Sequence, residues 1–147
     1  MNHSSPVQFL LVEDDSVDVE AVQRSFQRNE LQSPLFTTSD AQDALRILRG
    51  EAGPDAVQGP FVVLLDLNLP RMDGLEFLEA LRQDPSLKDT VVFVLSTSNA
   101  ERDKRAAYAH NVAGYFVKSD LGPGLESLVP LLRTYASVVH FPRASAA

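Results

Sequence analysis

Acidic, hydroxyl and basic side chains stand directly after four apolar runs of this sequence. They are Glu13, Asp14 and Asp15, then Asp66, then Ser96, and finally Lys118. Two ionised carboxylates held ~4 Å apart repel each other by about 4 kcal/mol at an effective dielectric near 20, so a cluster of them needs a proton or a cation. Oxygen ligands around an open site suit Mg²⁺. A carboxylate beside such a cation, a lysine and a hydroxyl can act as a nucleophile on phosphorus, which would give an aspartyl phosphate.

The apolar runs themselves are typical of buried strands. They are short, rich in Val, Leu and Phe, and cover residues 7–12, 34–38, 61–65, 91–95 and 113–117. Three of them are continuously apolar, as strands covered on both faces of a parallel sheet are. The segments between them have helical spacing, for example at Val19, Val22 and Phe26. This alternation predicts an α/β fold, a doubly wound five-stranded parallel sheet with helices on both faces. The carboxyl ends of the strands, where the polar side chains stand, are where such sheets bind ligands.

Capping residues suggest where several helices begin. Asp40 is predicted to cap the second helix, and Ser98 with Glu101 three residues later forms the pattern of a capping box for the fourth. Pro130 is tolerated only in a first turn, so we expect the last helix to begin near Ser127.

The composition indicates one globular domain with an acidic surface. Of the 147 residues 44% are hydrophobic, and 20 acidic against 13 basic residues give a formal net charge of −7. This charge repels phosphate backbones and argues against nucleic acid as a partner. The lack of cysteine excludes disulfides and thiolate catalysis, and fits a cytoplasmic location. The longest purely apolar runs, 61–65 and 91–95, are too short to span a membrane.

The domain is expected to cover residues 7–138. Residues 1–6 lack the basic and apolar regions of a signal peptide, and we expect them to be disordered. Residues 139–147 are expected to form a tail that could take part in a dimer. The segment Gly50–Pro60 is rich in Gly and Pro and is predicted to be a surface loop.

Four motifs together resemble the response-regulator receiver domain of two-component signalling. The matching segments are Leu10–Asp15, Asp66–Gly74, Leu95–Ser98 and Gly114–Lys118, each at its expected strand end. The resemblance covers roughly residues 9–138 and implies the flavodoxin-like receiver fold with strand order 2-1-3-4-5. It also implies that Asp66 accepts a phosphoryl group from a phosphohistidine on a sensor histidine kinase.

The resemblance assigns roles to the other polar residues. Glu13 and Asp14 match the acidic pair that positions Mg²⁺, Asp15 is a possible water-mediated helper, and the backbone carbonyl of Asn68 matches a further metal contact beside Asp66. For the phosphoryl group, Ser96 matches the switch hydroxyl with Thr97 beside it, Tyr115 matches the switch aromatic, and Lys118 the phosphate-contacting lysine.

Two departures from the family pattern point to a subgroup. Ser119 follows Lys118 where the family most often has proline, which leaves open whether the peptide between them is cis, and the loop Gly50–Pro60 is longer than usual. With the Phe141-Pro142 ending, these features resemble the single-domain receivers that partner bacterial phytochromes. Because fewer than ten residues follow Val139, we expect the output to be a protein contact, transfer of the phosphoryl group, or formation of a homodimer.

Simpler interpretations remain for several residues. Asp15 could be a helix cap, Tyr115 a core aromatic, and Thr97 and Ser98 turn or cap residues. Asp73 and Gly74 are interpreted as a helix cap and a turn glycine.

Other function classes fit the sequence less well. A phosphatase with an aspartate nucleophile generally has a second aspartate two residues later, where this chain has Asn68. An FMN-binding flavodoxin would need a phosphate-cradling loop after the first strand, where this chain has acidic residues. A pseudo-receiver that only binds partners would not need the complete set of acceptor groups.

Overall fold

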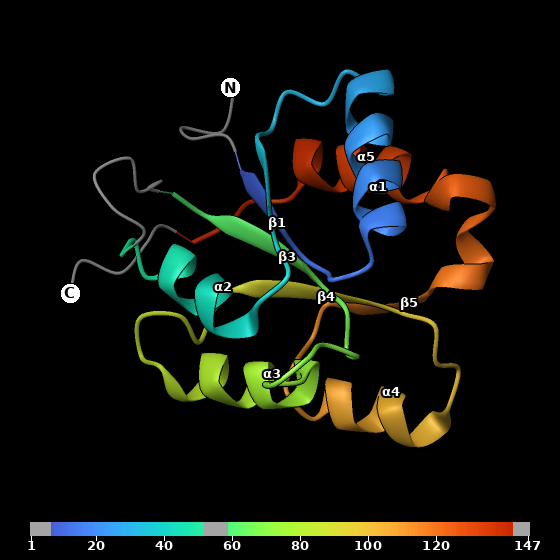
Figure 1. The fold of residues 1–147 in the computed structure, drawn as a ribbon. Helices are drawn as coiled ribbons and strands as arrows, with labels where there is room; N and C mark the ends of the chain where they lie inside the picture. Colours follow the sequence, from blue (N-terminus) through green and yellow to red (C-terminus); the bar gives the residue numbers. More distant parts are fainter. Residues whose placement is uncertain (1–6, 52–58, 143–147) are drawn as a thin grey trace.

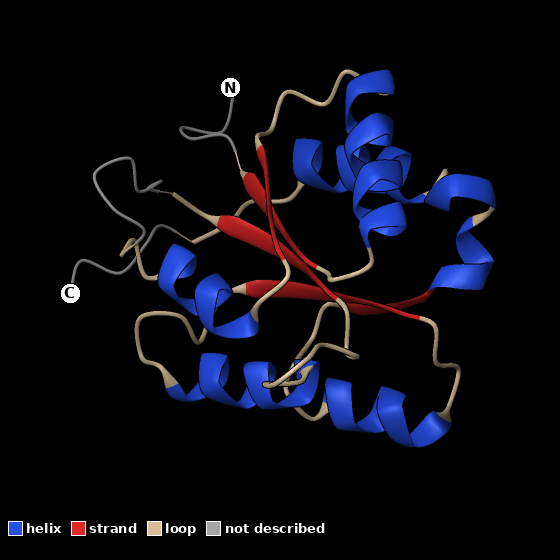
Figure 2. Ribbon diagram, viewed as in Figure 1, coloured by secondary structure: helices blue, strands red, loops and turns tan. Residues whose placement is uncertain are grey.

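In the part of the chain that the structure describes, five parallel strands and five α-helices alternate (Figures 1 and 2). The structure, a computed structural model, describes residues 7–51 and 59–142. The strands are β1 (Gln8–Val12), β2 (Leu35–Thr38), β3 (Phe61–Leu65), β4 (Val91–Ser96) and β5 (Gly114–Val117). The α-helices are α1 (Ser16–Arg28), α2 (Ala41–Leu48), α3 (Gly74–Gln83), α4 (Glu101–Tyr108) and α5 (Leu128–Val138). Two short 3₁₀ turns, η1 (Lys118–Leu121) and η2 (Pro123–Leu125), connect β5 to α5 and were not predicted.

The strand order in the sheet is β2-β1-β3-β4-β5, which confirms the predicted topology. The parallel register pairs Val12 with Leu65, so the residues that follow β1 and β3 emerge side by side. Ser96 at the end of β4 pairs with Val117 at the end of β5. The carboxyl ends of these four strands therefore form one edge of the sheet.

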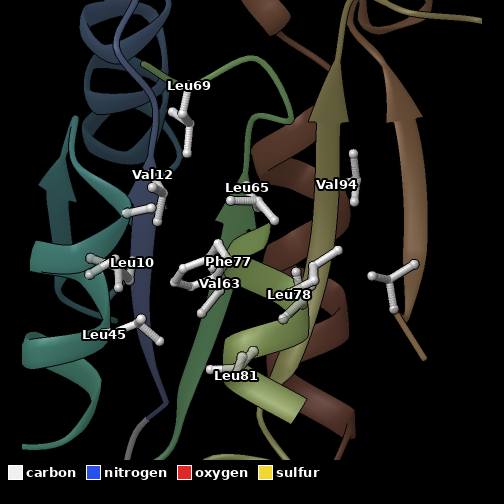
Figure 3. Packing of buried hydrophobic residues seen from close by; sticks show 14 of the residues in the cluster. Leu10, Val12, Leu45, Val63, Leu65, Leu69, Phe77, Leu78, Leu81 and Val94 are labelled. Atoms are coloured by element: carbon white, nitrogen blue, oxygen red, sulfur yellow. The ribbon is translucent and has the colours of Figure 1, made fainter. Parts of the chain in front are cut away.

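Two apolar layers hold the sheet between the helices. In Figure 1, α2, α3 and α4 cover one face of the sheet, while α1 and α5 cover the other. The first layer packs Phe77, Leu78 and Leu81 of α3 against strand side chains such as Val63 (Figure 3). The second packs helix residues, Leu128 among them, against the opposite face of the same strands. Side chains of a buried strand alternate between these layers, which is why the continuously apolar runs 61–65 and 91–95 lie in the central strands β3 and β4, whereas the run 113–117 lies in the edge strand β5.

The structure confirms most of the predicted helix starts and corrects one. The Asp40 carboxylate caps α2, and Ser127 is the N-cap of α5, with Pro130 in its first turn. The capping box predicted from Ser98 and Glu101 is wrong, because α4 begins at Glu101 with Ala100 as N-cap and no side chain caps it. The Ser98 hydroxyl instead accepts a hydrogen bond from the Ala100 amide, one residue before the helix.

Gly74 is not the turn glycine that the sequence suggested. It is the first residue of α3, and the preceding Asp73 forms a capping box with Glu76. A Cβ at position 74 would lie 2.6 Å from the Cα of Leu67 and 2.8 Å from the backbone oxygen of Asp66. Glycine is therefore required by close backbone approach, and not by an unusual backbone conformation.

Some predictions concern residues outside those described. The expectation that residues 1–6 are disordered, residues 52–58 of the predicted Gly50–Pro60 loop and residues 143–147 of the predicted tail all fall there. Within the described ranges 7–51 and 59–142, no helix is long and apolar enough to cross a membrane. All described peptide bonds are trans, including the one between Lys118 and Ser119.

Candidate phosphorylation site

Asp66 lies at the carboxyl end of β3, at the centre of the sheet edge. Only 5% of the surface of Asp66 is exposed to solvent. The Asp66 amide donates to the carbonyl of Val12 at 3.0 Å, which continues the ladder between β1 and β3 by one residue. Its Oδ1 accepts a hydrogen bond from the amide of Asn68 at 3.1 Å. The backbone thus fixes the Asp66 carboxylate at the rim of the sheet and leaves Oδ2 to face the neighbouring charges.

Glu13, Asp14 and Asp66 form the acidic cluster that the sequence predicted. Each offers a carboxylate oxygen, and these oxygens lie within 4.8 Å of one another. Glu13 and Asp66 are buried, whereas Asp14 is exposed, so the cluster is open to solvent on one side. The Glu13 Oε1 atom is buried and accepts no well-directed hydrogen bond from the described residues, although an ammonium lies nearby. A hard divalent cation with oxygen ligands fits this donor set and would satisfy that oxygen.

The charge state of Glu13 reflects the crowding. Burial, followed by the neighbouring Asp66 carboxylate, raises the pKa of Glu13 from 4.5 to about 8, and Lys118 lowers it only in part. In the absence of a cation, a proton on Glu13 relieves the repulsion among the carboxylates.

Lys118 reaches the same cluster from the end of β5. Its Nζ lies 2.7 Å from Oδ2 of Asp18, 2.8 Å from Oε1 of Glu13 and 3.9 Å from Oδ2 of Asp66. Burial disfavours the ammonium, but the contacts with Asp18 and Glu13 outweigh it and raise the pKa of Lys118 above its ordinary value. Lys118 is therefore a permanent positive charge in a pocket that leaves only 10% of its side chain exposed.

Ser96 and Tyr115 are connected through the backbone of Ser98. The fully buried Ser96 accepts a hydrogen bond at its Oγ from the Ser98 amide at 3.0 Å. Tyr115 donates from its hydroxyl to the Ser98 carbonyl at 3.0 Å. Its half-buried ring also packs against the core layer of α2, α3 and α4, as the simpler interpretation of a core aromatic held, and its role as a switch aromatic stays a prediction.

The remaining predicted site residues lie around this centre. Asn68 is exposed and lines a hollow together with Asp14 and Ser96. Thr97 is exposed beside Ser96. Asp15 caps α1, because its Oδ1 accepts hydrogen bonds from the amides of Val17 and Asp18, as the simpler interpretation held.

Asp18 is the residue that sequence reasoning missed. An acidic residue in the first turn of a helix is usually attributed to the helix dipole. Because Asp18 and Lys118 are 100 residues apart in the sequence, their ion pair could not be recognised from the sequence.

Comparison with known families shows which family the chain belongs to. Residues 9–124 match the model of the response regulator receiver domain. The match spans most of the chain, and the chain belongs to the response regulator receiver family.

Individual relatives show which members of the receiver family the chain resembles. Over 114 residues, 78% of each protein, the chain is 37% identical to Response regulator Rcp1 of Synechocystis sp. (strain ATCC 27184 / PCC 6803 / Kazusa). The structure of the phosphorylated cyanobacterial phytochrome response regulator RcpA matches with a TM-score of 0.76 and 29% identity, over 95% of this chain and 99% of that one. The Mn²⁺-bound form of Rcp1 matches with a TM-score of 0.74 and 31% identity, over 94% and 99%. The predicted resemblance to phytochrome-associated receivers is thereby confirmed.

Proposed function

We propose that Asp66 is the phosphoacceptor of this response regulator. An Asp66 carboxylate oxygen attacks the phosphorus of a phosphohistidine on a sensor histidine kinase, an O–P bond forms and the N–P bond breaks. The imidazole leaves with the electron pair of that bond. The observation that carries this proposal is the position of a buried carboxylate at the end of β3 with an ammonium 3.9 Å away and two further carboxylates beside it.

The cation that this reaction requires is proposed to be Mg²⁺. Glu13, Asp14 and Asp66 would hold it with their carboxylates, together with the backbone carbonyl of Asn68, and Asp15 could contribute through water. When bound, it neutralises charge on the transferring phosphoryl oxygens. The Mn²⁺ in the Rcp1 structure supports a divalent ion in a related protein.

The switch is proposed to run from Ser96 to Tyr115. The new phosphoryl oxygens are strong acceptors, and the Ser96 hydroxyl can turn to donate to one of them, with Thr97 beside it. Rotation of the Ser96 side chain about Cα–Cβ carries Oγ away from the Ser98 amide, which loses its present acceptor, and Ser98 also carries the carbonyl to which Tyr115 donates. A change at Ser96 is thus transmitted to β5 and α4. To shift a 1:99 equilibrium to 99:1, phosphorylation must favour the active state by ~5.5 kcal/mol.

The partner is proposed to be a sensor kinase such as a bacterial phytochrome. The named similarity to Rcp1 and to a phytochrome response regulator supports this choice. We also propose a cytoplasmic location, a single domain over 7–138, and a homodimer formed through the face of α4 and β5 and the tail 139–147. The acidic net charge supports a protein partner rather than nucleic acid.

Turnover of a separate substrate is not part of the proposal. The chemistry extends only to self-phosphorylation from a small donor and hydrolysis of the acyl phosphate. The phosphatase and pseudo-receiver alternatives gain no support from the relatives, which are response regulators.

Incubation with acetyl phosphate, followed by a Phos-tag gel, tests the proposal. The wild type should shift only when Mg²⁺ is present, Asp66→Asn should not shift, and Glu20→Gln, which removes an exposed carboxylate on α1, should behave as the wild type. Uptake of phosphate by Asp66→Asn, or a wild type that never shifts, would refute the assignment.

A further inference from the structure

Asp18 places a fourth carboxylate at the site, outside the predicted set. It lies in the first turn of α1, and 21% of its side chain is exposed. Its Oδ2 accepts a hydrogen bond from Nζ of Lys118 at 2.7 Å, the shortest of the distances between that nitrogen and the site carboxylates. Asp18 therefore contacts the phosphate-binding lysine and is not in the set of carboxylates that could share a cation.

The position of the ammonium follows from these contacts. Lys118 has three N–H donors, of which one is donated to Asp18, and Oε1 of Glu13 lies 2.8 Å from the same nitrogen. The distance of 3.9 Å to Asp66 exceeds a hydrogen bond. Oδ2 of Asp66 is thus near the ammonium of Lys118 but accepts no hydrogen bond from it. A phosphoryl group on Asp66 would add three acceptor oxygens, which extend farther from the backbone than the carboxylate does.

We propose that Asp18 is a positioning residue, which holds the ammonium of Lys118 off the Asp66 carboxylate so that the nucleophile stays free and the ammonium is ready for the phosphoryl oxygens. This inference rests on the proposed role of Asp66. Without Asp18, the attraction between Lys118 and Asp66 would draw the two into direct contact. The carboxylate would then be a poorer nucleophile, and the ammonium would have to be displaced before the phosphoryl group could enter.

Two competing roles for Asp18 lead to different kinetic results. A negative charge that acted only through space would repel an anionic phosphodonor, so its removal would speed phosphorylation. A carboxylate that only stabilised the N-terminus of α1 would change the free energy of unfolding and leave the reaction of the folded protein unaltered. Positioning predicts the opposite sign from the first and a kinetic effect that the second lacks.

The test is a double-mutant cycle on the rate of phosphorylation by acetyl phosphate at saturating Mg²⁺. The chain has no tryptophan, so time courses are followed on Phos-tag gels or by intact mass over a range of donor concentrations. Asp18→Asn, which keeps the side-chain shape, should lower the maximal rate about tenfold and leave KM within about twofold. In the Lys118→Ala background the same substitution should change the rate by less than about twofold, because its target is absent.

Matched variants make each outcome decisive. Glu20→Gln on the same helix should react as the wild type, and Asp18→Ser should repeat the effect if Asp18→Asn does not fold. An Asp18→Asn protein that reacts as fast as the wild type, or faster, overturns the inference, as does an equal loss in the Lys118→Ala background. If the wild type is phosphorylated at Asp66 while these results fail, only the role of Asp18 is refuted. A wild type that is not phosphorylated refutes the proposed function as well.

Discussion

The Tyr115 hydroxyl donates a 3.0 Å hydrogen bond to the backbone carbonyl of Ser98, in the loop between β4 and α4. The amide of Ser98 donates in turn to Oγ of Ser96 at 3.0 Å. The side chain that is proposed to sense the phosphoryl group and the aromatic residue on β5 are therefore joined by one residue. Movement of either one changes the hydrogen bonds available to Ser98.

Tyr115→Phe removes the donor and leaves the Ser98 carbonyl without this partner. We expect the free energy of unfolding to fall by about 1 kcal/mol, the usual contribution of such a hydrogen bond. Urea unfolding followed by circular dichroism measures it. Tyr108→Phe, with its exposed ring on α4, is the control and should change little. Equal unfolding curves for Tyr115→Phe and the wild type would contradict the contribution of this bond.

Gly74→Ala tests the contact between α3 and the backbone of Asp66 and Leu67, which follow β3. The added Cβ would lie 2.6 Å from the Cα of Leu67 and 2.8 Å from the Asp66 carbonyl oxygen, so backbone must shift. We expect a loss of about 1–3 kcal/mol in stability, as for other overpacked sites, and slower phosphorylation because Asp66 is displaced. Glu79→Ala, exposed on the same helix, is the matched control. A Gly74→Ala protein with wild-type stability would contradict the close approach.

The raised pKa of Glu13 predicts that metal binding depends on pH. At pH values below about 8 a cation must displace the Glu13 proton, so the apparent Kd should fall as the pH rises and level off above about 8. The change should approach tenfold per pH unit at most. Titration of Mg²⁺ by calorimetry in buffers of different ionisation enthalpy measures both the affinity and the released proton. Tight binding with no proton release at pH 7 would contradict the pKa.

The raised pKa of Glu13 also predicts the direction in which the stability of the metal-free protein changes with pH. Between about pH 4.5 and 8 the folded state keeps a proton on Glu13 that the unfolded chain has lost. The contribution of this group to the free energy of unfolding is complete below pH 4.5 and is lost as the pH rises toward 8. Urea unfolding in a chelator should therefore show a steeper loss for the wild type than for Glu13→Gln over this window. Equal slopes would contradict it.

Arg82 is predicted to be a structural clamp at the opposite end of α3. Its guanidinium donates to the backbone carbonyls of His110, Lys88 and Thr90 at 2.7 Å each, and to that of Asn111 at 3.1 Å. Burial lowers its pKa from the ordinary value. Because charged hydrogen bonds contribute about 1.5–3 kcal/mol each, Arg82→Met should reduce stability by roughly 3 kcal/mol or more.

Chemical denaturation checks this effect, with the exposed Arg102→Met as control. Phosphorylation at Asp66 should persist in folded Arg82→Met, since the clamp contacts none of the site residues. A substitution at Arg82 no more destabilising than the one at Arg102 would show that the clamp is dispensable.

The sequence was sufficient to predict the strands and the cluster of polar side chains at their carboxyl ends. Continuous apolar runs predict buried strands, and the polar residue after each run, such as Asp66 or Lys118, then falls on one edge of the sheet by topology alone. The cluster of Glu13, Asp14 and Asp66 could be predicted because all three follow adjacent strands.

The features that were missed depend on contacts between distant elements. Asp18 pairs with a lysine 100 residues away, and Gly74 is required by the backbone of Leu67, so neither leaves a local pattern. Ser98 fits a capping motif locally, but its backbone is engaged by Ser96 and Tyr115, and α4 begins only at Glu101. Of these contacts only the one with Tyr115 joins distant parts of the chain, and it leaves no local pattern.

A crystal structure with beryllofluoride and Mg²⁺ tests the central claim most directly, because this complex stands in for the phosphoryl group on an aspartate. We expect beryllium to be bonded to a carboxylate oxygen of Asp66, with the ammonium of Lys118 and the hydroxyl of Ser96 both donating to fluorine. A structure in which Asp66 remains free under saturating beryllofluoride, or in which Lys118 points to solvent, would refute the proposed role of Asp66.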